Sequence, residues 1–201
     1  MNISFYLPLI LFCVSSSITP GPNNLMIMMS SLHFGLRRSL PHFLGICIGF
    51  TILILCVGLG LAFIFSDYPE AHWIVKIIGA TYILWLAWKI ISASTKLSEE
   101  SKKKPLSFLQ AVLFQWVNPK AWVMAIGATS TYTSVNSGFS MNTQILIIAL
   151  IYFLTVLPCT GAWMLGGHTF KKILTNEAHQ RIFNLVLGLL LVISIIIMLY
   201  E

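Results

Sequence analysis

The chain has 201 residues, of which 57% are hydrophobic and 9% are charged, and its mean hydropathy is +0.87. These values lie far outside the range of ordinary soluble domains, so they exclude a soluble enzyme or binding module and indicate an integral membrane protein. The formal charge of +6 would suit a nucleic-acid ligand by itself, but the positions of the basic residues indicate another role.

A membrane-spanning helix needs about 20 mostly apolar residues. Six segments meet this requirement, at about 4 to 30, 40 to 65, 72 to 93, 107 to 131, 142 to 167 and 180 to 200. We therefore predict an all-α membrane protein with six transmembrane helices in a single domain, residues 1–201. The alternative for residues 3–14, the apolar core of a signal peptide, is disfavoured because no Lys or Arg precedes it and the apolar run continues beyond any cleavage point.

Lysine and arginine gather in every second loop. The first, third and fifth loops and their edges hold Arg37, Arg38, Lys89, Lys96, Lys102, Lys103, Lys104, Lys171, Lys172 and Arg181, and the second and fourth loops hold none. The positive-inside rule then puts the odd-numbered loops in the cytoplasm and both termini outside. Anionic lipid headgroups are sufficient partners for these residues, so no nucleic acid is expected.

The first apolar segment is interrupted by Thr19-Pro-Gly-Pro-Asn-Asn24. A proline inside a helix costs about 3 kcal/mol, and unpaired backbone groups in hydrocarbon cost more unless protein or a water-filled cavity receives them. A helix that begins at Pro22 presents free N–H groups and a partial positive charge, which suit a carboxylate. We therefore take Pro20, Gly21, Pro22, Asn23 and Asn24 as substrate-binding candidates, the alternative being a packed kink whose amides bind neighbouring helices.

The second and third segments contain a packing motif and one further candidate. Gly45 and Gly49 have the small-xxx-small spacing that lets helices approach closely, within the chain or in a homodimer. Tyr82 lies deeper in the membrane than the interfacial Trp85 and Trp88, and its hydroxyl needs a partner. Tyr82 is therefore a candidate contact for the substrate.

A second interruption, Asn118-Pro119-Lys120, occurs about a dozen residues into the fourth segment. Lys120 is then expected near the middle of the membrane, where a lysine costs about 2.5 to 3.5 kcal/mol and is by default a functional candidate. The alternative is a helix that begins later, with an amine that reaches the cytoplasmic surface. In the fifth segment Pro158 predicts a kink, and the roles of Pro158 and His168 stay open.

The two interruptions occupy corresponding places in two halves of the chain, residues 1–93 and 107–201, joined by a cytoplasmic loop at 94–106. Since each half has three spans, the halves must be inverted relative to each other. Inverted repeats with discontinuous helices that meet at the membrane centre are typical of secondary transporters. We therefore predict two inverted three-helix repeats in which helices one and four are discontinuous.

The sequence lacks the residues that metal binding, a carboxylate proton relay, ATP hydrolysis or disulfide chemistry would require. All six acidic residues lie in loops or at the end of the chain, namely Asp67, Glu70, Glu99, Glu100, Glu177 and Glu201, so a metal site or a carboxylate proton relay within a span is not expected. No GxxxxGK[ST] motif supports ATP hydrolysis. Cys13, Cys47, Cys56 and Cys159 form no CxxC pair. We expect no cofactor and no enzymatic activity.

Across nearly its whole length the chain resembles the LysE/RhtB family of bacterial amino-acid exporters. The resemblance is carried by Pro20 to Asn24 with Gly35, Arg37 and Arg38, by Gly45 and Gly49, by Gly79 to Trp88, and by Asn118 to Ala121. The segment from Gly167 to Leu191 is most similar to the branch that exports cysteine and O-acetylserine (EamB-like). The resemblance implies six helices and efflux across the inner membrane driven by the proton gradient. Many members have an acidic residue at the position of Phe50. The phenylalanine in this chain fits a branch that exports small neutral substrates.

These observations predict a secondary exporter of small neutral amino acids such as cysteine, O-acetylserine, homoserine or threonine. The substrate carboxylate would lie at the helix terminus near Pro22, with hydrogen bonds from Asn23, Asn24 and Asn118, and Lys120 would supply positive charge or change protonation. One alternative is export of another small solute or of a divalent cation, and the missing carboxylates and histidine clusters argue against the cation. A second is a thiol-disulfide conductor, which would need paired cysteines beside the prolines. A third is a purely structural subunit.

Overall fold

The computed structural model describes residues 3–61, 69–92, 104–133, 138–173 and 176–200, and these are helical with short connections and no strand. The prediction of an all-α protein is confirmed. The helices are α1 (Ile3–Ile18), α2 (Pro22–Phe34), α3 (Leu36–Cys56), which ends in a wider π-helical turn η1 (Val57–Leu61), α5 (Pro69–Ile91), α7 (Phe108–Phe114), a 3₁₀ turn η2 (Gln115–Val117), α8 (Pro119–Thr131), α9 (Met141–Ile173) and α10 (Glu177–Tyr200).

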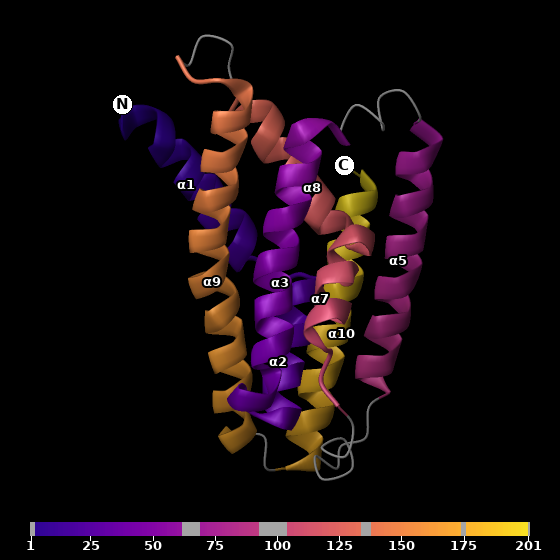
Figure 1. Cartoon of the computed structure of the whole chain (residues 1–201). Coiled ribbons are helices and arrows are strands. Elements are labelled where there is room, and N and C mark those ends of the chain that lie inside the picture. Colours follow the sequence, from indigo (N-terminus) through magenta and orange to yellow (C-terminus); the bar gives the residue numbers. More distant parts are fainter. Residues whose placement is uncertain (1–2, 62–68, 93–103, 134–137, 174–175, 201) are drawn as a thin grey trace.

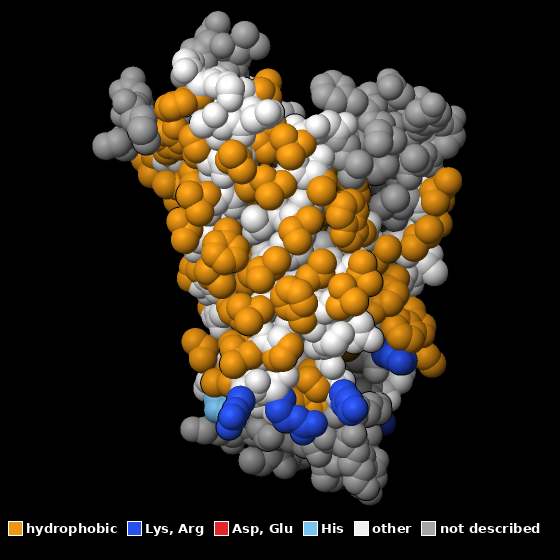
Figure 2. All heavy atoms as spheres, viewed as in Figure 1, with side chains coloured by type: hydrophobic (Ala, Val, Ile, Leu, Met, Phe, Trp, Pro, Cys, Tyr) orange, Lys and Arg blue, Asp and Glu red, His pale blue; other side chains and the backbone are white. Residues whose placement is uncertain are grey.

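The helices lie side by side, and the chain passes up and down between two ends of the bundle (Figure 1). The start of α1 and the end of α10 lie at one end, and the connection between α2 and α3 lies at the other. On the face shown in Figure 2, hydrophobic side chains cover the middle of the molecule and Lys and Arg gather at the lower end. Exposed basic residues at this end, hereafter the basic end, are Arg37, Arg38, Lys89, Lys104 and Arg181.

Within the described residues, two helices are long and apolar enough to cross a membrane, Leu36–Gly60 and Met141–Phe170. The first and fourth predicted spans fail this length criterion because each is divided. Helices α1 and α2 have 16 and 13 residues, and α7 and α8 have 7 and 13. A break inside an apolar segment therefore leaves two helices that are each shorter than the criterion requires.

Helices α3 and α9 each pack against several other helices. Helix α9 packs against α1, α2 and α3, while α3 also packs against α7. Phe50 of α3 and Tyr152 of α9 meet edge to face with ring centroids 5.2 Å apart, and both side chains are buried. Gly167 of α9 lies so close to Met28 and Ser31 that a Cβ there would overlap them, and Ser31 donates a hydrogen bond to the carbonyl of Met164 (2.6 Å).

The small-xxx-small motif of α3 packs within the chain. A Cβ on Gly45 would overlap Phe108 and Ala111 of α7, and one on Gly49 would lie 2.7 Å from the Cα of Val112. Helix α3 therefore lies close to α7 at these two glycines, which are already covered by this neighbouring helix.

The contacts between helices follow the same pattern in both halves of the chain when α1, α2, α3 and α5 are matched with α7, α8, α9 and α10. Helix α3 packs on α7 as α9 packs on α1, and α2 packs on α9 as α8 packs on α3. Helix α10 likewise contacts α2 as α5 contacts α8, and α5 pairs with α10. The four elements of the first half thus have counterparts in the second half with matching neighbours.

Candidate functional site

Both predicted helix interruptions are present. Helix α1 ends at Ile18, and α2 begins at Pro22 after an extended stretch that ends with Gly21 (φ 178°). In the second half, Asn118 is extended (φ −90°, ψ 102°) between the 3₁₀ turn η2 and α8, which begins at Pro119. Both prolines occupy the first turn of a helix, where a missing backbone N–H costs nothing.

Side chains from three helices complete the broken end of α1. The amide nitrogen of Asn24 donates to the carbonyls of Ser17 (2.7 Å) and Thr19 (2.9 Å), and the indole nitrogen of Trp163 donates to the carbonyl of Ile18 (2.9 Å). The last carbonyls of a helix have no partner within the helix. The protein supplies these partners itself, which is how irregular backbone persists inside an apolar bundle.

Lys120 provides the remaining donors at this end. Its Nζ donates to the carbonyls of Thr19 and Pro20 (both 3.1 Å) and to Oγ1 of Thr19 (2.7 Å). A Cβ on Gly21 would lie 2.8 Å from Cδ and 3.0 Å from Nζ of Lys120, so the glycine leaves the space that the lysine fills. The structure therefore places the amine at the end of α1, and not at the basic end of the bundle as the alternative reading required.

A reciprocal pair of amides connects the two breaks. Nδ2 of Asn23 donates to Oε1 of Gln115 (2.8 Å), and Nε2 of Gln115 donates to Oδ1 of Asn23 (3.1 Å) and to the carbonyl of Ala111 (2.9 Å). Gln115 is fully buried. Sequence reasoning missed Gln115 as a site residue, although it lies only three residues before Asn118.

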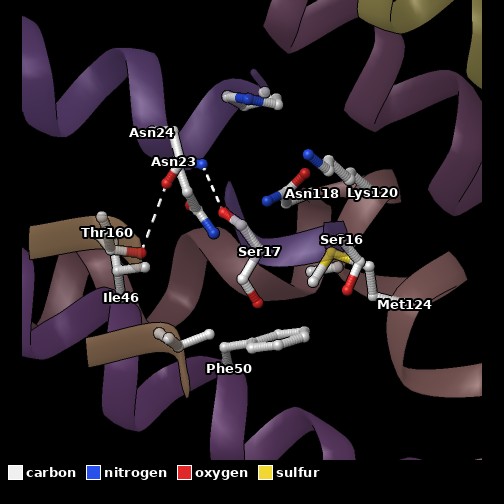
Figure 3. Close-up of a pocket in the computed structure, with 14 residues that line it drawn as sticks. Ser16, Ser17, Asn23, Asn24, Ile46, Phe50, Asn118, Lys120, Met124 and Thr160 are labelled. Carbon is white, nitrogen blue, oxygen red and sulfur yellow. Dashed lines mark hydrogen bonds between the residues drawn. The ribbon is translucent and has the colours of Figure 1, made fainter. Parts of the chain in front are cut away.

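A cavity of about 30 Å³ lies between the two breaks and is closed by α3 and α9 (Figure 3). Six of the predicted site residues line it, namely Gly21, Pro22, Asn23, Asn24, Asn118 and Lys120. The other lining residues were not anticipated: the polar ones are Ser16, Ser17 and Thr160, and the apolar ones are Ile46, Phe50, Ala121, Met124 and Val156. The run of serines before the first break was the signal available for Ser16 and Ser17.

Three predicted site residues do not line this cavity. Pro20 contributes its carbonyl to Lys120, and the ring of Pro119 faces Gly79 of α5. The ring of Tyr82 packs against Phe114 and Trp85, with centroids 5.4 Å apart in each pair. The structure thus brings the two broken helices together and places Tyr82 among aromatic neighbours.

Two buried polar atoms in the cavity wall have no hydrogen-bond partner in the structure, Oγ of Ser17 and Oδ1 of Asn118. Their side chains are 6% and 2% exposed. Leaving a buried polar group unpaired costs about 1–3 kcal/mol, so such groups call for a functional explanation. Asn24 differs, because its nitrogen donates twice and its Oδ1 accepts from Oγ1 of Thr160 (3.4 Å).

The electrostatics of the cavity favour an anion at one side. Neither α2 nor α8 has a side-chain cap at its first turn, so the N–H groups of this turn point toward the breaks with partial positive charge. Among the lining residues, Lys120 alone is ionisable. The cavity therefore contains donors for a carboxylate. Beside it, the carbonyls of Thr19 and Pro20 at the end of α1 already bind an ammonium group.

The alternative of a thiol-disulfide conductor gains no support from this arrangement. All four cysteines are free, and three of them are buried. The positions beside the two prolines hold asparagine and lysine side chains, which carry no thiol.

Comparison with known proteins gives one consistent result. A family model described as LysE type translocator matches residues 14–200. Cysteine/O-acetylserine efflux proteins of Escherichia coli (strain K12), Shigella sonnei (strain Ss046) and Shigella flexneri are each 33% identical over 186 residues, which is 90% of this chain and 90% of theirs. No solved structure was found to match the chain.

Proposed function

This chain belongs to the LysE family of translocators, and from that premise we propose that it is a secondary exporter of small neutral amino acids across the bacterial inner membrane. Cysteine, O-acetylserine, homoserine and threonine are the substrates proposed. The observation that carries the proposal is the cavity between the two helix breaks, with its two unpartnered polar atoms and its single lysine.

The substrate carboxylate is assigned to the side of the cavity formed by the first turns of α2 and α8. There the backbone N–H groups, Nδ2 of Asn118 and the hydroxyl of Ser17 are the donors assigned to the carboxylate, and neither Asn118 nor Ser17 has to break a side-chain hydrogen bond. Binding a carboxylate at helix N-termini uses the partial positive charge of both helices. Asn23 lines the same space, but its amide is held by Gln115.

The substrate ammonium group is assigned to the carbonyls of Thr19 and Pro20. These carbonyls now bind the amine of Lys120, so the geometry for a primary amine is already present. The apolar wall, which includes Ile46, Phe50 and Val156, suits a small uncharged side chain. A space of about 30 Å³ holds roughly two water molecules, so the lysine side chain must leave before an amino acid enters.

Competition between Lys120 and the substrate ammonium supports proton coupling. A protonated Lys120 occupies the carbonyls, and release of its proton to the cytoplasm frees them for the ammonium of a zwitterionic substrate. After the substrate leaves on the outer side, Lys120 takes up a proton there and returns to the carbonyls. One proton then enters for each amino acid exported, and no carboxylate relay is required.

We assign the chain six membrane spans in two inverted repeats, residues 1–93 and 107–201, joined by a cytoplasmic loop at 94–106. The matching helix contacts of the two halves support the repeat, and the alternating direction of the helices supports the number of spans. The basic end would face the cytoplasm, with both termini outside. Lipid surrounds the exposed apolar side chains, such as those of Leu109 and Ile182.

Transport in inside-out membrane vesicles tests the function. With an acidic interior, vesicles containing the chain should accumulate labelled homoserine, threonine, O-acetylserine or cysteine beyond vesicles without it, and dissipating the gradient should abolish the accumulation. Lysine, with its cationic side chain, is the matched substrate expected to be excluded. Absence of uptake and of counterflow for all four neutral amino acids would contradict the proposal.

A further inference from the structure

A second cavity, of about 250 Å³, lies at the basic end of the bundle between α2, α3, α5 and residues 104–106. Its wall on α2 is formed by Met26, Met29, Ser30 and His33, which recur at the spacing of one helix face. None of these residues lines the cavity between the two helix breaks, hereafter the central cavity. This larger space, hereafter the lower cavity, has no role in the function proposed above.

The polar lining of the lower cavity is suited to an anion. His42 of α3 is 2% exposed, and its Nδ1 has no hydrogen-bond partner. Lys89 and Lys104 also line the cavity, and both are exposed. No Asp or Glu stands among the described lining residues. The amine of Lys89 lies 4.1 Å from the centre of the ring of Trp85, an exposed side chain that does not line the cavity, and this cation–π contact favours the charged amine.

The two cavities follow one another along α2. Asn23 lines the central cavity and Met26 lines the lower one, a separation of three residues or about 4.5 Å along the helix axis. Met26 is 7% exposed. Methionine has three rotatable bonds and adapts to changing shapes, so the side chain of Met26 can change the shape of the lower cavity where α2 leads toward Asn23.

We propose that the lower cavity is an inner loading site, in which His42, Lys89 and Lys104 bind the carboxylate of a small amino acid before it passes Met26 into the central cavity. This inference rests on the proposed function for the direction of movement. The occupant is the soluble amino acid, since the site lies between three helices and its lining residue Met26 stands three residues from Asn23, which lines the central cavity.

Protection of an introduced thiol tests this site without requiring transport. Leu106→Cys places a thiol in the cavity wall outside any helix, and Arg38→Cys places one on the same end of the bundle outside both cavities. Inside-out vesicles without a gradient would be treated with a membrane-impermeant thiol reagent, with the unsubstituted chain as the background. Homoserine should slow labelling at 106, whereas 3-amino-1-propanol, its analogue without the carboxylate, should not. Labelling at 38 should be unaffected by either.

Charge removal provides a second measurement. Lys89→Gln and Lys104→Gln should each raise the homoserine concentration needed for half protection by about two- to fivefold, the range expected for one solvated charge pair. Arg38→Gln should leave it unchanged. Lys89→Arg should retain protection, because the charge remains.

The outcomes separate this site from the proposed function. Unprotected labelling at 106 together with normal flux would overturn the loading site and leave export intact. Protection without flux would support the site and contradict export. Protection that depends on anionic phospholipid in reconstituted vesicles and not on homoserine would assign the cavity to a lipid headgroup and would also overturn the inference.

Discussion

The side-chain amides of Asn23 and Gln115, 92 residues apart in the sequence, exchange two hydrogen bonds of 2.8 and 3.1 Å. This pair joins the first turn of α2 to the 3₁₀ turn that precedes α8. Each broken helix therefore holds the other in position, and the cavity between them depends on both.

The amide pair should show coupled stability effects. Gln115→Leu leaves the amide of Asn23 without its partner, so we expect a loss of about 1–3 kcal/mol in the free energy of unfolding. Adding Asn23→Leu should cost less than the sum of the two single changes, because both partners are then removed. Denaturant unfolding of the purified protein in detergent measures the cycle, and strictly additive losses would contradict the pairing.

Asn24 and Asn118 should respond differently to the same substitution. Asn24→Leu removes two donors from the end of α1 and should reduce both thermal stability and flux. Asn118→Leu removes an amide whose Oδ1 has no partner and whose Nδ2 is assigned to the substrate carboxylate. Stability should therefore be retained while flux falls by about tenfold or more, the loss expected when one polar contact to a bound group is removed. The comparison requires equal amounts of protein in the membrane. Normal flux in Asn118→Leu would remove this residue from the substrate site.

Lys120→Met should abolish proton-driven accumulation of substrate while leaving substrate-for-substrate exchange. The variant lacks the only ionisable group in the cavity wall, so accumulation driven by the proton gradient should be lost. Counterflow of substrate against substrate should persist, because the carbonyls of Thr19 and Pro20 stay available to the ammonium group. Arg181→Met, which removes a basic residue from the exposed surface of α10, is the matched control. Gradient-driven accumulation by Lys120→Met would refute the coupling scheme.

Gly21→Ala should act through Lys120. Gly21 is extended, a conformation that alanine adopts without strain, so the effect comes from the Cβ, which would lie 2.8 Å from Cδ of Lys120. Displacing the amine should lower flux by at least about tenfold, since small misplacements of binding groups carry large costs. Gly166→Ala, where a Cβ meets no heavy atom within 4 Å, should leave flux unchanged. Equal flux in the two variants would contradict the contact.

The predicted elements differ in how far local sequence specifies them. The helix interruptions at Pro20–Pro22 and Pro119 follow from local chemistry, because proline removes a backbone donor wherever it stands in a helix. The positions of the apolar segments follow in the same way from composition. Tyr82 shows where such reasoning stops, since a hydroxyl in an apolar helix needs a partner but the sequence does not say which face meets the substrate. Its ring lies against Phe114 and Trp85.

The sequence by itself determined that this is an apolar helical chain with two breaks, six of whose residues around those breaks line one cavity. Only the tertiary structure decided that Gln115 holds Asn23, that Ser17 and Asn118 are left unpartnered, and that Lys120 binds the carbonyl end of α1. The physical reason is the sequence distance over which each interaction acts. A proline acts on its own helix, whereas hydrogen bonds between residues about a hundred positions apart exist only after the helices have packed.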